Sequence, residues 1–167
     1  MSHPDQARAA LIDTLADRLG PSGGLRDPAD TAPFCSDWRG LYHGRTDAVL
    51  RPNGTEQLAT AVRLCTEAGG VVRIVPMGGN TSMVGGAAVG EDGSELVLSL
   101  SRMNRIRAID PVDMTMTVEA GVTLKAAQDA AEEAGCLLPL SISSEGSATI
   151  GGVLATNAGG NNTVRYG

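Results

Sequence analysis

The sequence is poor in aromatic residues and in the side chains that usually form metal sites. It has one tryptophan, two tyrosines and one phenylalanine in 167 residues. Its two histidines, His3 and His43, are too few and too far apart for a metal cluster or a Ser–His–Asp triad. Three cysteines without a Cys-x-x-Cys spacing indicate neither a disulfide framework nor a zinc site. We therefore predict that the chain holds no metal.

The chain also lacks an excess of positive charge and any long apolar run. It has 13 basic and 19 acidic side chains, a net charge of −6, so it has no basic surface for nucleic acid. Runs such as Leu96–Leu98 are far shorter than the ~18 residues that span a bilayer, and the N-terminus has no signal-peptide pattern. We expect a cytoplasmic protein without a membrane span, in which 42% hydrophobic residues supply a folded core.

Glycine, by contrast, is abundant: the chain has 22 glycines, about twice the usual ~7%. A first cluster, PMGGNTSMVGG over residues 76–86, directly follows an apolar strand pattern. Successive backbone N–H groups in such a turn form a concavity that binds anions, so a diphosphate is the expected ligand. The spacing matches neither the P-loop nor the Gly-x-Gly-x-x-Gly of nicotinamide dinucleotide sites. A tight loop without a ligand is the alternative.

The second cluster, GSATIGGVLATNAGG over residues 146–160, has small residues at nearly every position. A flat ring system can lie against such a backbone, although a turn that packs closely on a neighbouring element is an equally good interpretation. The two clusters lie about 70 residues apart with strands between them, so we expect stretches around Gly79 and Gly151 to face each other across a slot. A dinucleotide has the matching length.

Periodicity and turn residues predict a mixed α and β order. We expect a helix over 5–19, an extended crossing segment over 21–37, and a βαβ unit made of a strand at 48–51, a helix over 55–68 that Thr55 caps, and a strand at 71–76. Further strands are predicted at 95–100, 105–109 and 114–120, followed by a helix over 123–134 and a helical turn at 150–158. Between 114 and 120, methionine and valine alternate with Thr115, Thr117 and Glu119, as in a half-buried strand.

The two glycine clusters, together with Pro139-Leu140 and the closing Arg165-Tyr166-Gly167, resemble the FAD-binding domain of the vanillyl-alcohol oxidase and p-cresol methylhydroxylase family. Within it they are most similar to the FAD-linked D-2-hydroxyacid dehydrogenases, which include D-2-hydroxyglutarate dehydrogenase, D-lactate dehydrogenase and the glycolate oxidase flavin subunit. The resemblance implies an α+β, PCMH-type fold of two subdomains, the first complete and the second truncated. It also implies an N-terminal helix and crossing segment over 1–33 and an FAD-binding domain over 34–167.

By position, the resemblance implies that the first cluster binds the FAD pyrophosphate and that the second lines the ring and ribose. Asn80 and Thr81 stand where members that attach FAD covalently commonly carry histidine, so non-covalent binding is implied. The implied cofactor-binding residues are Pro76, Met77, Gly78, Gly79, Asn80, Thr81, Ser82, Gly85, Gly86, Pro139, Leu140, Ser141, Gly146, Ser147, Ile150, Gly151, Gly152, Ala155, Asn157 and Gly159.

The family implies a parent enzyme that oxidises a D-2-hydroxy acid of the 2-hydroxyglutarate or lactate class by hydride transfer to flavin N5, with a separate electron acceptor. Family members are much longer, and their cap domain supplies the catalytic and metal-ligating histidines. We therefore expect no catalytic residue in this chain and no turnover from it alone, with a homodimer as an open option. The alternatives are a non-catalytic flavin-binding fragment or interaction module, and a flavin reductase acting on nucleotide sugars.

Overall fold

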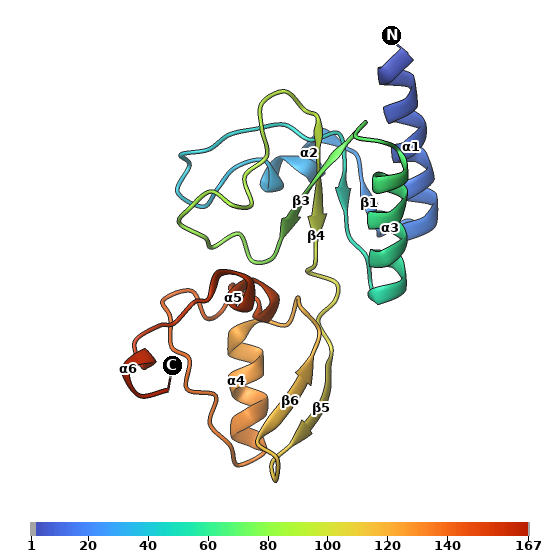
Figure 1. The fold of residues 1–167 in the computed structure, drawn as a ribbon. Coiled ribbons are helices and arrows are strands. Elements are labelled where there is room, and N and C mark those ends of the chain that lie inside the picture. The colour runs from blue at the N-terminus through green and yellow to red at the C-terminus, as the bar shows by residue number, and fades with distance from the viewer. Residues whose placement is uncertain (1–2, 167) are drawn as a thin grey trace. The chain divides into compact units, whose positions relative to one another are not determined.

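The computed structural model describes residues 3–166, which form two compact units. The first contains residues 3–77 and 82–102, and the second contains residues 78–81 and 103–166 (Figure 1). Met1 and Ser2 of the predicted N-terminal region and Gly167 of the last motif lie outside the described residues. The short stretch 78–81 is the middle of the first glycine cluster, so this cluster divides between the two units.

The first unit is built on a four-stranded sheet in the order β1-β2-β4-β3. Its elements are α1 (His3–Leu19), β1 (Gly24–Leu25), α2 (Pro28–Thr31), η1 (Ala32–Phe34), β2 (Val49–Leu50), α3 (Thr55–Glu67), β3 (Arg73–Met77) and β4 (Glu95–Ser99). Strands β2 and β3 both pair in parallel with β4, whereas β1 pairs antiparallel with β2. The predicted βαβ unit therefore exists, but its two strands are not neighbours because β4 lies between them. Strand β4 takes the central place because its Leu96, Val97 and Leu98 are all buried.

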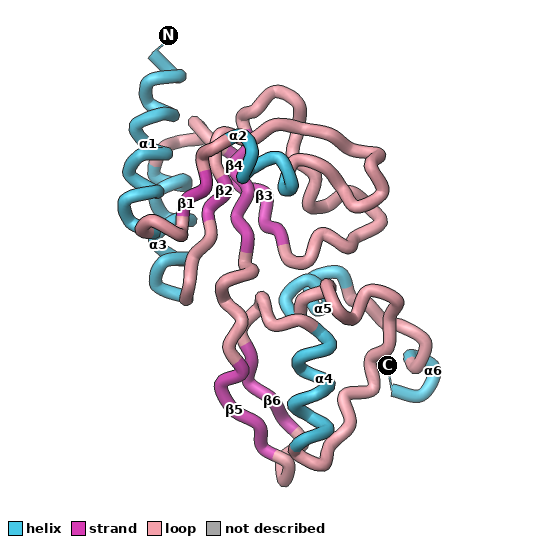
Figure 2. Tube along the Cα trace, turned by 180° about the vertical axis from the view of Figure 1, so that it is seen from behind, coloured by secondary structure: helices cyan, strands magenta, loops and turns pink. Residues whose placement is uncertain are grey.

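Both faces of this sheet are covered. Helices α1 and α3 lie side by side on one face, where Leu15 of α1 and Cys65 of α3 pack with Leu50 and Leu96 of the sheet (Figure 2). On the other face, Val49, Val75 and Val97 pack with residues of the segment that contains η1 and of the loop before β4. The predicted N-terminal region 1–33 thus contributes α1 to the core of this unit.

Two local predictions for this unit are wrong. The crossing segment over 21–37 is not simply extended, because it contains β1, α2 and η1. Helix α2 forms there because Asp27 caps it, its side chain accepting a hydrogen bond from Ala29 N–H, and because proline suits a first helical position. Thr55 does not cap α3: it is the first helical residue, and Gly54 is the cap.

The second unit combines a hairpin with three helices. Its elements are β5 (Ile106–Asp110), β6 (Thr115–Val118), α4 (Leu124–Glu133), α5 (Ile150–Thr156) and the short α6 (Thr163–Tyr166), which the sequence did not predict. The hairpin is antiparallel, and α4 lies along it in both backbone views (Figures 1 and 2). Thr123 caps α4 by accepting a hydrogen bond from Ala126 N–H.

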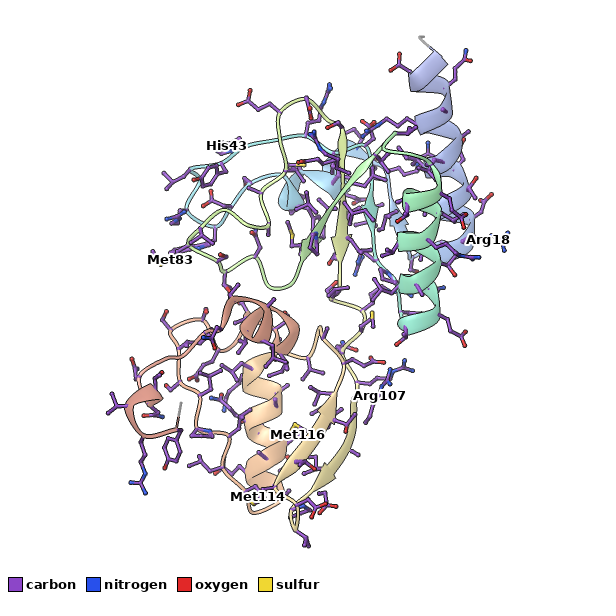
Figure 3. All side chains as sticks on the ribbon, viewed as in Figure 1. Arg18, His43, Met83, Arg107, Met114 and Met116 are labelled. Atoms are coloured by element: carbon purple, nitrogen blue, oxygen red, sulfur yellow. The ribbon has the colours of Figure 1, made fainter. Side chains whose placement is uncertain are left out.

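The predicted strand over 114–120 is shorter at both ends. Met114 adopts a left-handed backbone conformation, with φ of 53°, at the hairpin turn, and its side chain is exposed (Figure 3). Glu119 lies beyond β6 and is buried, with 3% of its surface exposed, although its alternation with Thr115 and Thr117 predicted the solvent side. The alternation therefore holds only for Thr115–Val118.

Candidate functional site

The two glycine clusters meet within the second unit. A methyl group added to Gly79 would lie 1.8 Å from the backbone oxygen of Ser147, and one added to Gly78 would lie 2.4 Å from the hydroxyl oxygen of Thr149. The same position on Gly78 is 3.9 Å from the Cα of Gly152. Real Cβ atoms do not approach other atoms this closely, so the backbone at Gly78 and Gly79 leaves no room for a side chain. The first cluster therefore packs its backbone directly on the start of the second.

Hydrogen bonds to the segment 120–125 fix the start of the second cluster. The N–H groups of Ile150 and Gly151 donate to the carbonyls of Val122 and Ala120, at 2.8 and 2.9 Å. In the opposite direction, Leu124 N–H donates to the carbonyl of Ala148 at 2.8 Å. These bonds use the N–H groups of the first turn of α5, which a helix cannot satisfy internally.

The hydroxyl of Thr149 is buried and has no hydrogen-bond partner. Thr149 is the N-cap residue of α5, yet its side chain makes no capping hydrogen bond, and the N–H groups of Ile150 and Gly151 donate to other carbonyls. A buried hydroxyl without a partner is costly in a folded protein and commonly marks a place where a ligand or an ordered water completes the bonding. Thr149 is not in the predicted cofactor-binding set, although its place before Ile150-Gly151-Gly152 could have indicated it.

The predicted glycines fall into two groups. Packing within the protein requires glycine at Gly79, Gly151 and Gly159. A methyl group added to Gly151 would lie 2.7 Å from the side chain of Ala120, and Gly159 lies against Thr163. In contrast, a methyl group on Gly86 or Gly146 would meet no atom within 4 Å. The bare backbone at Gly86 and Gly146 is therefore not required by packing and is free to approach a ligand.

Three successive carbonyls of the predicted segment 139–141 bond within the protein. Pro139 O, Leu140 O and Ser141 O accept hydrogen bonds from Asn162 Nδ2, Gln128 Nε2 and Asn161 N–H. The Ser141 side chain, with Gln128 and the N–H of Ile142, holds the pKa of the Glu145 carboxyl below its usual value. These bonds make the segment rigid, so any contact that it makes with a ligand has to use its remaining surface.

Two asparagines of the predicted set adopt the left-handed conformation, in which asparagine is better tolerated than most residues. Asn80 has φ of 52° in the first cluster, and Asn157 has φ of 50° where α5 ends. Of the other predicted residues, Pro76 and Met77 end β3, and Ala155 lies exposed on α5. Ser82 and Gly85 belong to the part of the first cluster that lies in the first unit.

Beside the second cluster, the buried side chain of Glu119 forms ion pairs with two arginines. Its carboxylate accepts hydrogen bonds from Arg105 Nη2 at 2.7 Å, from Arg105 Nε and backbone N–H at 3.0 Å, and from Arg107 Nη2 at 3.0 Å. These donors, the Arg105 side chain first, lower the pKa of Glu119 from 4.5 to about 2. Glu119 directly precedes Ala120, whose carbonyl accepts a hydrogen bond from Gly151 N–H, so this ion cluster anchors the segment 120–125 that bonds to the first turn of α5.

The first unit contains a cavity of about 520 Å³ next to α2 and η1. Its lining includes Arg26, Cys35 and Arg45, and none of the predicted cofactor-binding residues. Among the described residues, no group of three or more His, Cys, Asp or Glu side chains is arranged to hold a metal ion. No helix in the described part of the chain is long and apolar enough to cross a membrane.

Residues 46–167 match the sequence family described as an FAD binding domain. The chain belongs to this FAD-binding domain family. The relatives support the same branch: a D-2-hydroxyglutarate dehydrogenase of Xanthomonas citri is 39% identical over 84% of this chain, and the mitochondrial D-2-hydroxyglutarate dehydrogenase of Bos taurus is 37% identical over 93%. The D-2-hydroxyglutarate–pyruvate transhydrogenase of Saccharomyces cerevisiae is 37% identical over 84%. FAD is accordingly the cofactor of this domain, as predicted.

The fold of this FAD-binding domain is found in solved structures. An alkyldihydroxyacetonephosphate synthase matches 95% of this chain with a TM-score of 0.81 at 24% identity and is covered over 32% of its own length. A p-cresol methylhydroxylase matches 91% with a TM-score of 0.69 at 23% identity and is covered over 29%. The predicted α+β, PCMH-type fold is confirmed. The chain spans only 26 to 29% of the length of its curated relatives.

Proposed function

We propose that this domain is the FAD-binding part of a flavin-dependent oxidoreductase that oxidises a D-2-hydroxy acid of the 2-hydroxyglutarate or lactate class. The observation that carries the proposal is the direct contact of Gly78–Gly79 with Ser147–Thr149, which joins the two predicted cofactor motifs in one place. Within the second unit, the unpartnered Thr149 hydroxyl and the bare backbone at Gly146 fit a ligand rich in hydrogen-bonding oxygens, such as FAD. The names of the relatives support the substrate class.

The cofactor is held without a covalent bond, mainly by backbone groups of the two clusters. When bound, FAD supplies the ring atom N5 that accepts the hydride of the substrate. The chain's own part is to hold the phosphates and to orient the ring against a rigid backbone, which Glu119 and the bonds of segment 120–125 to α5 keep in place. The residues that we propose for this task are Pro76, Met77, Gly78, Gly79, Asn80, Thr81, Ser82, Gly85, Gly86, Pro139, Leu140, Ser141, Gly146, Ser147, Ile150, Gly151, Gly152, Ala155, Asn157 and Gly159, with Thr149 added.

A titration with FAD tests the proposal. We expect the 167-residue chain to quench flavin fluorescence on binding, and Gly146→Ala to weaken FAD binding about three- to tenfold because the methyl group displaces at least one backbone hydrogen bond. The thermal unfolding of the variant without FAD should match that of the wild type, since the methyl group meets no atom within 4 Å. Gly90→Ala is the matched control, because its methyl group meets only side-chain atoms at 3.5 Å or more outside both clusters. A wild-type chain that leaves flavin fluorescence unchanged would overturn the proposal.

A second candidate function follows because the chain covers only part of the length of its relatives. We propose that the chain alone binds flavin without turnover, because it spans only 28 and 29% of two D-2-hydroxyglutarate dehydrogenases, and the family resemblance implies that the base and the substrate-binding groups belong to the rest of the enzyme. Mixing the chain with FAD, a panel of D-2-hydroxy acids and a dye acceptor should give no dye reduction above that of free flavin. A hydroxy acid substrate, an electron acceptor and a homodimer are proposed partners of the whole enzyme.

For the location, we keep the cytoplasm as our proposal. The bovine relative is named as mitochondrial, which makes the mitochondrion or a related compartment the competing location. Cell fractionation with an antibody against this chain would decide between them.

A further inference from the structure

The loop 36–43 of the first unit, which we name the brace loop, is held by hydrogen bonds within the loop. Asp37 is buried, and its carboxylate accepts hydrogen bonds from the N–H groups of Leu41 and Tyr42, at 2.7 and 2.9 Å. These backbone bonds, with Tyr42 first, lower the pKa of Asp37. Ser36 and His43 pair across the base of the loop, and Gly40 turns it with φ of 67°. The loop is thus preorganised without help from a ligand.

The brace loop touches residues 82–86, the second half of the first glycine cluster, at two points. The indole Nε1–H of Trp38 donates to the carbonyl of Ser82 at 3.2 Å. A methyl group added to Gly85 would lie 2.9 Å from ring atom Cε2 of Tyr42, and Gly85 has φ of 69°. Figure 3 shows His43 and Met83, which belong to these two segments, on the side of the unit away from Arg18 of α1. Two of the four aromatic residues of the chain therefore contact this one loop.

These contacts contribute little to the core. Trp38 is 59% exposed and Tyr42 is 48% exposed, so each leaves about half of its surface in solvent. Within the loop that they touch, Met83 and Val84 are exposed as well. Hydrophobic stabilisation is proportional to buried area. The brace loop therefore contributes more to holding the segment 82–86 in place than to the stability of the first unit.

We propose that Trp38 and Tyr42 are positioning residues that hold the segment 82–86 in the conformation in which its backbone meets the FAD phosphates. The inference rests on the proposed function, because it assigns the segment 82–86 to phosphate binding. A loop fixed before binding loses less conformational entropy when the ligand arrives, so the brace raises affinity without touching the cofactor. Neither Trp38 nor Tyr42 belongs to the predicted cofactor-binding set.

Trp38→Phe is the first test, because it keeps an aromatic ring and removes the indole N–H. We expect amide hydrogen exchange at residues 82–86 to become several-fold faster in the protein without FAD, and FAD to bind about three- to tenfold more weakly. The ³¹P resonances of bound FAD should shift relative to the wild type, while the thermal unfolding of the FAD-free protein stays the same. A Trp38 that is merely structural would give the opposite pattern, with a lower unfolding temperature and unchanged ³¹P resonances.

Tyr42 provides a matched pair of variants. Tyr42→Phe keeps the ring atoms that face Gly85 and should leave exchange and FAD affinity as in the wild type, whereas Tyr42→Ala should reproduce the effects of Trp38→Phe. Wild-type exchange at residues 82–86 in both Trp38→Phe and Tyr42→Ala overturns the brace itself. Faster exchange with unchanged FAD affinity overturns its role in binding, whereas a wild-type protein that binds no FAD overturns the proposed function and with it that role.

Discussion

Gly79→Ala should unfold much of the second unit or prevent it from forming. Its methyl group would lie 1.8 Å from the carbonyl oxygen and 2.6 Å from the carbonyl carbon of Ser147, and both are backbone atoms that a rotamer change cannot move. We expect the free energy of unfolding to fall by about 3 kcal/mol, at the upper end of the range for overpacking. Urea unfolding followed by circular dichroism measures this loss, and FAD titration should show that binding is lost with it.

Gly86→Ala is the control for this prediction. Gly86 belongs to the same glycine cluster, but its methyl group would meet no atom within 4 Å, so stability should stay within about 0.5 kcal/mol of the wild type. If Gly79→Ala were as stable as Gly86→Ala, the close packing of the two clusters would be refuted.

Glu119→Gln should produce the largest effect of any charge change in the described residues of the second unit. The amide keeps one acceptor oxygen but turns an NH₂ group toward the guanidinium donors of Arg105 and Arg107, which the carboxylate of Glu119 now binds. The unfolding temperature at pH 7 should fall by several degrees, and the exchange of Gly151 N–H, which bonds to Ala120, should become faster. Glu133→Gln removes the same charge from an exposed position of α4 and should have little effect.

The stabilisation that Glu119 provides should depend on pH, and the direction follows from its lowered pKa. Because the pKa of Glu119 is lowered from 4.5 to about 2 in the folded protein, its ionised form stabilises the folded state fully above about pH 4.5. This contribution disappears as the pH falls toward 2. The difference in unfolding temperature between wild type and Glu119→Gln should therefore shrink steadily across this range. A difference that stays constant from pH 7 to pH 2.5 would show that Glu119 acts by its shape and not by its charge.

Several elements could be predicted because their information is local. The helix at 55–67 and the strand at 95–99 follow from apolar spacing and bounding turn residues, and both form close to the predicted bounds. The prediction for the crossing segment failed because β1 depends on its pairing with β2, and α2 depends on a single capping bond that Ala29 N–H donates to the side chain of Asp27. Such contacts leave little periodicity in the sequence.

The buried position of Glu119 was missed for a related reason. A charged residue in an alternating strand pattern normally faces solvent, and only the hairpin register brings Arg105 and Arg107 to the carboxylate. The alternation of Arg105 and Arg107 opposite an acidic strand end is a signal that could have indicated the cluster. Thr149 was missed because an N-cap threonine normally uses its hydroxyl for the helix, and the bonds that Ile150 and Gly151 donate to the carbonyls of Val122 and Ala120 are not visible in the sequence.

The sequence by itself determined the family, the cofactor and the two glycine clusters, because these depend on residue types that occur in a fixed order along the chain. Only the tertiary structure decided which glycines the protein needs for its own packing, such as Gly79 against Ser147, and which leave bare backbone, such as Gly146. It also decided that Trp38 and Tyr42 contact the first cluster. Trp38 and its partner Ser82 are 44 residues apart in the sequence. The physical reason is that glycine is selected both for close packing and for ligand approach, and the two demands differ only in what lies within a few ångströms of the missing side chain.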